Sequence, residues 1–164
     1  KFKKYTLADE FLVFFFKYIE PNLRVIKESS SRRLFETLTQ NSFDSWLGFA
    51  FERFCLKHAG LLALVMDFAD DLLLASPFFK KNDEGFQIDL LYKRADRVIT
   101  VCEIKHQNIK VGTQIITEMQ RKCALLKVPR GYALEKALIS LYGPDNSLRD
   151  TGYFHHFVTL DDIL

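Results

Sequence analysis

The chain has 164 residues, enough for one folded domain with a buried core, and its composition is ordinary apart from 16 Phe. Its formal net charge is only +2, so any basic surface for nucleic acid must be a local patch. The longest apolar run, Phe11 to Phe16, is too short to span a bilayer, and no signal peptide is recognisable. We expect a soluble, cytoplasmic protein without a membrane partner.

Three cysteines, Cys55, Cys102 and Cys123, lie far apart, each within an apolar segment. Their odd number and the absence of a CxxC pair argue against a disulfide framework, and reduced, buried thiols are expected. The first residue is Lys1 rather than Met, so we expect the chain to be a piece of a longer protein.

The amino-terminal segment is expected to be helical. One helix is predicted over Tyr5–Ile19, with Thr6 or Asp9 as its cap, and a second, more polar helix over 22–40. The first helix is unusually aromatic, and its rings either pack in the core or dock onto a part of the parent protein. We expect residues 1–41 to be a helical extension and 42–164 to be the main domain.

An amphipathic helix is predicted to follow. Apolar side chains recur at three- and four-residue intervals from Phe43 to His58, after Asn41 and Ser42 as caps. Glu52 lies just outside this apolar stripe, where it is either a solvated residue or a third acid for a site on the sheet. His58 is interpreted as a core histidine rather than a metal ligand.

Three strands come next: the first begins at Ala75–Phe79, the second covers 85–92 and the third covers 98–105. Because side chains alternate along a strand, Glu103 and Lys105 share a face of the third. In the second strand, Gln87, Asp89 and Leu91 are expected to share a face in the same way. The third strand is so apolar that we expect it to be central and buried on both faces.

If the second and third strands pair as a hairpin, Asp89, Glu103 and Lys105 converge on one point. Two nearby carboxylates repel each other unless a cation lies between them, and oxygen ligands suit Mg²⁺. The hypothesis is a metal-dependent phosphodiesterase site. The same charge pattern also occurs on the wet face of a half-buried sheet, so both interpretations stay open.

A helix over 111–127, a buried strand over 136–141 and a short strand over 157–160 are predicted to complete the domain. Lys110, Arg121 and Lys122 supply local positive charge, either as a solvated helix surface or as phosphate contacts. His155 and His156 are interpreted as surface residues. The element order predicts an α/β fold with a mixed sheet flanked by helices. No GxxxxGK[ST] loop is present, so no nucleotide site is expected.

The predicted order of helices and strands resembles the restriction-endonuclease-like αβββαβ core of the PD-(D/E)XK nuclease superfamily. Asp89 lies on the second strand of this order, and Glu103-Ile104-Lys105 lies on the third. More narrowly, four segments resemble the C-terminal nuclease-like domain of archaeal and bacterial AAA+ family ATPases. These segments are Tyr5–Leu12, Trp46–Glu52, Gln87–Leu91 and Cys102–Lys105. In that family an ATPase module and a winged helix precede this region, so the resemblance implies both as partners, together with DNA. Self-association is left open.

The resemblance also implies roles for the central residues. Asp89 and Glu103 would hold Mg²⁺, or Mn²⁺ in its place, with the carbonyl of Ile104. Lys105 would position the attacking water or stabilise charge on the phosphate. The implied activity is metal-dependent hydrolysis of DNA phosphodiester bonds.

Three further residues are auxiliary candidates. Glu52 matches the helix acid that some superfamily members add to the metal site. Lys122 falls where many members place a polar residue on the helix after the third strand. The P in the name PD-(D/E)XK denotes a Pro before the motif Asp, but in this chain Gln87-Ile88 precedes Asp89. Gln87 is taken as an auxiliary candidate because of this position.

Two alternatives compete with an active nuclease. The chain could be a catalytically inactive module that binds DNA or protein and regulates the same ATPase. The acid and lysine could instead form a buried structural ion pair between Lys105 and Asp89, in which case Asp89→Ala should unfold the domain.

Overall fold

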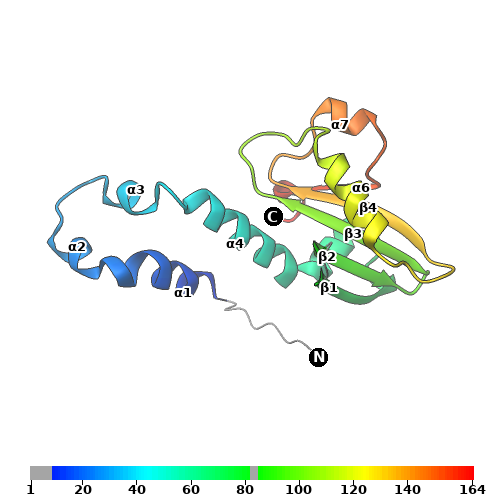
Figure 1. Ribbon diagram of the computed structural model, residues 1–164, viewed down its shortest axis with the longest axis horizontal. Helices are drawn as coiled ribbons and strands as arrows, with labels where there is room; N and C mark the ends of the chain where they lie inside the picture. The colour runs from blue at the N-terminus through cyan, green and yellow to red at the C-terminus, as the bar shows by residue number, and fades with distance from the viewer. Residues whose placement is uncertain (1–8, 82–84) are drawn as a thin grey trace. The chain divides into compact units, whose positions relative to one another are not determined.

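The computed structural model describes residues 9–81 and 85–164 (Figure 1). The chain divides into two compact units, Lys1–Ala50 and Phe51–Leu164, and the boundary falls within helix α4 (Phe43–Lys57). The expected helix start at Tyr5, the cap Thr6 and part of the loop before Gly85 lie outside the described residues.

The first unit is helical, as the sequence predicted. Helix α1 (Glu10–Phe14) is capped by Asp9, whose Oδ1 accepts a hydrogen bond from Leu12 N at 2.9 Å. A π-helical turn, η1 (Phe15–Ile19), and a 3₁₀ turn, η2 (Glu20–Asn22), continue it. The single helix expected over 22–40 is wrong, because the structure has two short helices, α2 (Leu23–Glu28) and α3 (Leu34–Thr39).

Two serines explain this interruption. The Ser29 hydroxyl accepts a hydrogen bond from Ser31 N at 3.1 Å, and the Ser31 hydroxyl accepts one from Arg33 N at 3.2 Å. Such local side-chain bonds compete with the helical hydrogen bonds of the backbone, so the helix ends at α2 and restarts at α3.

Aromatic rings make up the core of the first unit. Phe14 contacts Tyr18 and Trp46, with ring centroids 5.1 and 5.3 Å apart, and the buried Tyr18 hydroxyl lies 2.9 Å from Ser42 Oγ. The expected core role therefore holds for these rings. Phe11 and Phe16 are exposed instead.

The second unit is built on a five-stranded sheet in the order β1-β2-β3-β4-β5. The strands are β1 (Leu72–Lys80), β2 (Phe86–Arg94), β3 (Val98–Lys105), β4 (Ala133–Ser140) and β5 (His156–Thr159). Strands β1 to β3 pair antiparallel and β3 to β5 pair parallel, which confirms the predicted mixed α/β sheet.

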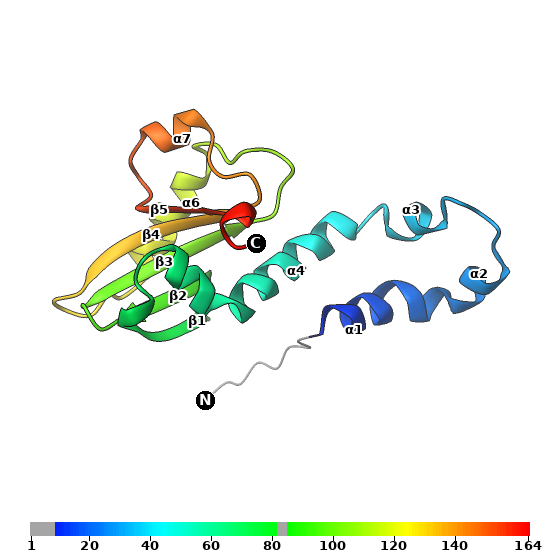
Figure 2. The same ribbon diagram turned by 180° about the vertical axis from the view of Figure 1, so that it is seen from behind.

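Helices flank both faces of this sheet. Helix α6 (Ile115–Leu125) connects β3 to β4 and lies in front of the sheet in Figure 1 and behind it in Figure 2. Its Met119 packs with Val101 and Leu138 in one core. The end of α4 and helix α5 (Ala59–Val65) pack in the other core with Cys102 and Ile104. Strand β3 therefore lies between two cores, and the expectation of a central strand buried on both faces is confirmed.

The link between β3 and α6 differs from the sequence prediction. The helix begins at Ile115 rather than at 111, because Val111 is held in an extended bridge to Pro144. Val111 N donates to the Gly143 carbonyl at 2.9 Å. A short helix that the sequence did not predict, α7 (Asn146–Asp150), follows this bridge and is capped by Asp145.

Two smaller predictions have clear outcomes. The thiols of Cys55 and Cys102 are buried and free, as expected, and burial raises the pKa of Cys55 to about 12. Of the helices in residues 9–81 and 85–164, none has the length and apolarity needed to cross a membrane.

Candidate active site

The candidate site forms where β2 and β3 separate. The two strands pair from Lys93–Ile99 to Leu90–Cys102, and the pairing ends there. Asp89, the next residue of β2, accepts a hydrogen bond through Oδ2 from Ile104 N at 3.1 Å. A carboxylate thus takes the place of a main-chain partner and fixes Asp89 beside the end of β3.

A bulge in β2 sets the direction of this segment. Strand β1 advances two residues, from Ser76 to Phe78, while β2 moves three, from Leu91 to Ile88. Ile88 and Leu91 consequently lie on the α6 side, whereas Leu90 packs in the opposite core. The expected alternation of Gln87, Asp89 and Leu91 on one face is therefore wrong across the bulge, and Gln87 is exposed.

Glu103 is the most deeply buried acid of the site, with 1 % of its surface exposed. Its Oε1 lies 2.8 Å from Lys105 Nζ, and its Oε2 lies 2.6 Å from Lys122 Nζ. Lys122 comes from α6 and is 8 % exposed. A buried carboxylate requires such partners, and here each oxygen has an ammonium group.

The ion pairs differ from one sequence-based alternative. One alternative predicts a buried structural ion pair between Lys105 and Asp89. In the structure, Lys105 pairs with Glu103 instead. Burial acts to lower the pKa of Lys105, but the charge and hydrogen bond of Glu103, together with the Asp89 and Glu52 carboxylates, outweigh burial and raise it. Lys105 therefore remains an ammonium group at the centre of the site.

The other two acids lie in unfavourable electrostatic surroundings. Burial, and then the Glu103 carboxylate, raise the pKa of Asp89. Glu52, on the half-buried end of α4 within the second unit, also has a raised pKa, first from burial and then from Asp89. Lys105 acts in the opposite direction on both. Carboxyl groups that raise one another's pKa favour the entry of a cation.

A pocket of about 240 Å³ adjoins the Glu103–Lys105 pair. Its wall is formed by the end of β3, the following loop and the first turns of α6. The residues that line it are Glu103, Lys105, Gln107, Val111, Gln114, Ile115 and Glu118. The Lys105 side chain is 42 % exposed, so it joins the buried acid to an accessible surface.

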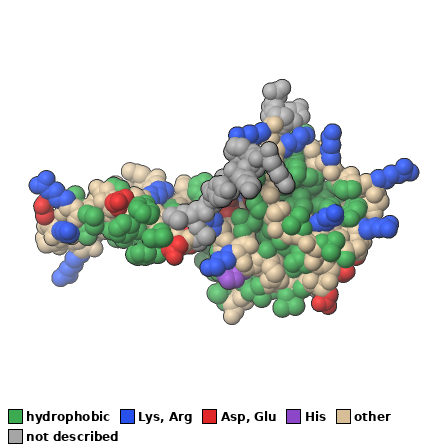
Figure 3. All heavy atoms as spheres, turned by 90° about the horizontal axis from the view of Figure 1, so that it is seen from below, with side chains coloured by type: hydrophobic (Ala, Val, Ile, Leu, Met, Phe, Trp, Pro, Cys, Tyr) green, Lys and Arg blue, Asp and Glu red, His purple; other side chains and the backbone are tan. Residues whose placement is uncertain are grey.

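The three expected phosphate contacts lie in different surroundings. Lys110 is exposed, and Arg121 is exposed with its guanidinium 2.8 Å from Glu118. Lys122 is buried against Glu103, so a phosphate contact would require it to leave that pair. On the face drawn in Figure 3, Lys and Arg side chains stand at separate points, most of them along the margin, rather than in one block.

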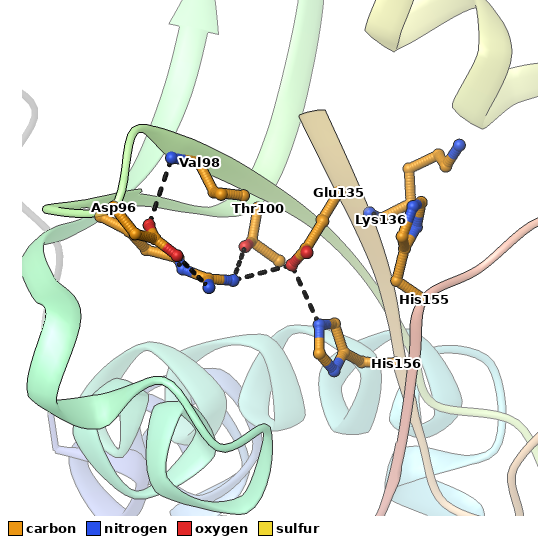
Figure 4. Close-up of polar contacts among 8 residues, drawn as sticks. Asp96, Val98, Thr100, Glu135, Lys136, His155 and His156 are labelled. Atoms are coloured by element: carbon orange, nitrogen blue, oxygen red, sulfur yellow. Dashed lines mark hydrogen bonds and ion pairs between the residues drawn. The ribbon is translucent and has the colours of Figure 1, made fainter. Parts of the chain in front are cut away.

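A second charged cluster, which the sequence did not reveal, lies toward the start of β3 (Figure 4). The Arg94 guanidinium, half-buried over the Phe68 ring, binds Asp96 and lies 2.7 Å from Glu135 Oε2. His156 Nε2 lies 3.1 Å from the same Glu135 oxygen. The expected surface position therefore holds for His155, while His156 is half-buried.

One further residue near the site was missed by sequence reasoning. Ser140, at the end of β4, is 1 % exposed, and its hydroxyl has no hydrogen-bond partner among the described residues. It lies in register with Lys105 on the neighbouring strand. The only signal in the sequence is a lone hydroxyl in an apolar run, which is too common to identify a site.

The residues fit a divalent cation through oxygen ligands. Asp89 is fixed on Ile104 N where the strands separate, and burial first, then the nearby Glu103 carboxylate, raise its pKa. Among the described residues, no three His, Cys, Asp or Glu side chains are arranged to hold a metal ion. The expected ligand set has two such side chains and the Ile104 carbonyl, and the arrangement with Glu52 as a third acid ligand is not found among the described residues.

The comparisons with known proteins give a family. The sequence model of DUF234, described as archaea bacterial proteins of unknown function, matches residues 15–118. The chain belongs to this family. Neither the curated proteins nor the solved structures include a significant match.

Proposed function

We propose that this chain is a Mg²⁺-dependent nuclease module that hydrolyses DNA phosphodiester bonds. The observation that carries the proposal is that Asp89 is fixed on Ile104 N where β2 and β3 separate, close to the buried Glu103, with Lys105 reaching from Glu103 to a pocket. Carboxyl groups with raised pKa values, here Asp89 and Glu52, are typical of functional sites, and the neighbouring Glu103 lines the pocket.

Each residue of the site has a role in this proposal. Asp89, Glu103 and the Ile104 carbonyl would hold Mg²⁺, with Glu52 as an outer acid. When bound, the ion would lower the pKa of its water and offset charge on the phosphoryl oxygens. Lys105 supplies a compact positive charge at the pocket, which suits contact with a non-bridging phosphate oxygen.

The proposed setting is a larger AAA+ family ATPase in the cytoplasm. The resemblance in Trp46–Glu52 and Cys102–Lys105 supports this, with the ATPase module and winged helix as the amino-terminal partners. Lys110 and Arg121, both exposed near α6, are the proposed phosphate contacts away from the scissile bond.

A cleavage screen tests the proposal. The purified chain is incubated with Mg²⁺ or Mn²⁺ and a panel of single-stranded, duplex, flap and branched DNA, alongside Glu103→Gln and a control in EDTA. We expect cleavage by the wild type alone, and only with metal. Cleavage that persists in Glu103→Gln would point to a contaminating nuclease or to a different site.

A second function is favoured by a specific observation. Both oxygens of Glu103 already have lysine partners, and Phe11 and Phe16 are exposed on the first unit. These features suit an inactive module that binds DNA or protein and regulates the ATPase. Binding of DNA with full affinity in EDTA, without cleavage of any substrate, would support this alternative.

A further inference from the structure

The two lysines of Glu103 differ in their freedom to move. Lys122 Nζ, on Oε2, belongs to a side chain that is only 10 % exposed. Lys105 Nζ, on Oε1, belongs to a side chain that is 42 % exposed and lines the pocket, whereas Lys122 is not among the described residues that line it. Displacing Lys122 would leave a buried ammonium without a partner, but Lys105 can leave Glu103 without that penalty.

An acceptor for a displaced Lys105 is present on the next strand. Ser140 is the register partner of Lys105 in the parallel β3–β4 pair, so their side chains emerge from the same face. Leu138, two residues before Ser140, packs in the α6-side core, which identifies that face. Within residues 9–81 and 85–164, the buried Ser140 hydroxyl has no hydrogen-bond partner, a situation rare enough in proteins to require a reason.

From this geometry we propose that Lys105 has two positions. In the absence of metal its ammonium occupies Glu103 Oε1, and when a divalent cation takes that oxygen the ammonium moves to the Ser140 hydroxyl. Lys122 stays on Oε2 throughout and fixes the orientation of Glu103. Ser140 is thus a positioning residue that holds Lys105 at the ends of β3 and β4 after exchange. This inference rests on the proposed function, because it requires a cation at Glu103.

A double-mutant cycle on Mn²⁺ affinity tests the exchange. Calorimetry gives the Kd for the wild type, Ser140→Ala, Lys105→Met and the double variant, with Ser147→Ala, an exposed serine on α7, as the matched control. We expect Ser140→Ala to weaken Mn²⁺ binding about tenfold, the scale of one hydrogen bond to a charged group. Its melting temperature without metal should not fall, since the hydroxyl makes no bond there.

Lys105→Met should tighten Mn²⁺ binding, because a competing cation is gone. The double variant should then bind as Lys105→Met does, since Ser140 acts only through the lysine. Lys122→Met is the matched charge control: it also removes an ammonium from Glu103, but we expect no gain in affinity. Circular dichroism checks its fold, and Lys122→Gln, which also removes the charge but can still donate a hydrogen bond to Glu103, replaces it if it unfolds.

The outcomes separate the inference from the proposed function. Absence of Mn²⁺ binding in the wild type would overturn both. Binding by the wild type with an unchanged Kd in Ser140→Ala would overturn the inference alone. A loss in Ser140→Ala that persists in the Lys105→Met background would also overturn it, by showing that Ser140 binds the cation directly.

Discussion

Two charged clusters, one half-buried and one with a buried acid, lie toward opposite ends of β3, and they balance their charges differently. At the start of the strand, Arg94 is bound by Asp96 and Glu135 and covers the Phe68 ring, and His156 adds a further contact to Glu135. At the end of the strand, by contrast, the pKa values of Asp89 and Glu52 are raised by burial and by neighbouring acids.

The contrast separates a stabilising cluster from a reactive one. In the first, one cation links residues of β2, the following turn and β4, so its charges hold the sheet together. In the second, acids are kept close although they repel one another, which lowers stability and is typical of sites that bind a ligand. Variants of the cluster at one end of β3 can therefore serve as controls for variants of the cluster at the other end.

The largest expected effect is on metal binding. Asp89→Asn should abolish Mn²⁺ binding and lower any cleavage by orders of magnitude, measured by calorimetry and by DNA digestion. The chain should remain folded, because the amide oxygen can still accept from Ile104 N. Its Tm should rise by about 2–4 °C for each ~1 kcal/mol of repulsion removed.

Asp96→Asn is the matched control at the other end of β3. It should lower Tm and leave the Kd for Mn²⁺ unchanged. Unfolding of Asp89→Asn, with Asp96→Asn intact, would reverse the roles assigned to the two clusters.

Next in size is the loss of stability in Arg94→Met. Removing one partner of a buried pair costs roughly 3–5 kcal/mol, and we expect about 2–3 because the Asp96 and Glu135 side chains are partly solvated. Urea unfolding measures this, and the Kd for Mn²⁺ should not change. Arg130→Met, at an exposed position, should stay within about 0.5 kcal/mol of the wild type.

Asp89 should make the folded chain less stable as pH rises, which is the opposite of the usual effect of a carboxyl group that is stabilised by a cation. Because its pKa is raised in the folded chain, the folded state holds this proton more tightly than the unfolded state does. Stability should therefore fall as pH rises from about the ordinary value of 3.8 through the raised pKa. Urea unfolding without metal measures the free energy of unfolding of the wild type and of Asp89→Asn at each pH. The value for the wild type minus that for the variant should fall by about 1.4 kcal/mol for each tenfold gain in proton affinity of Asp89 on folding. Parallel curves for the two proteins would contradict it.

Glu52→Gln should have the smallest effect on the site. This acid is half-buried, and Asp89 and Lys105 act on it through electrostatics, so we expect Mn²⁺ affinity to fall about tenfold, the low end for residues that support metal ligands. Calorimetry measures it, with Glu28→Gln in the first unit as a control that should bind as the wild type does. A loss as large as that of Asp89→Asn would make Glu52 a direct ligand.

The sequence alone determined the elements that depend on local pattern. The apolar run of β3 predicted a central buried strand, and the two-residue period placed Glu103 and Lys105 on one face. The same pattern predicted the order of strands and helices in the mixed sheet. These features follow from the covalent geometry of one strand at a time, so they need no knowledge of distant contacts.

Only the tertiary structure decided the partners of each charged group. Three features depend on register and helix packing between distant segments. The bulge in β2 interrupts the face that carries Gln87, Lys122 is buried against Glu103, and Arg94 pairs with Glu135. Ser140 shows this most clearly, since its unpartnered hydroxyl next to Lys105 follows from the β3–β4 register. A one-residue shift in register would move such a side chain to the other face, and no local pattern specifies it.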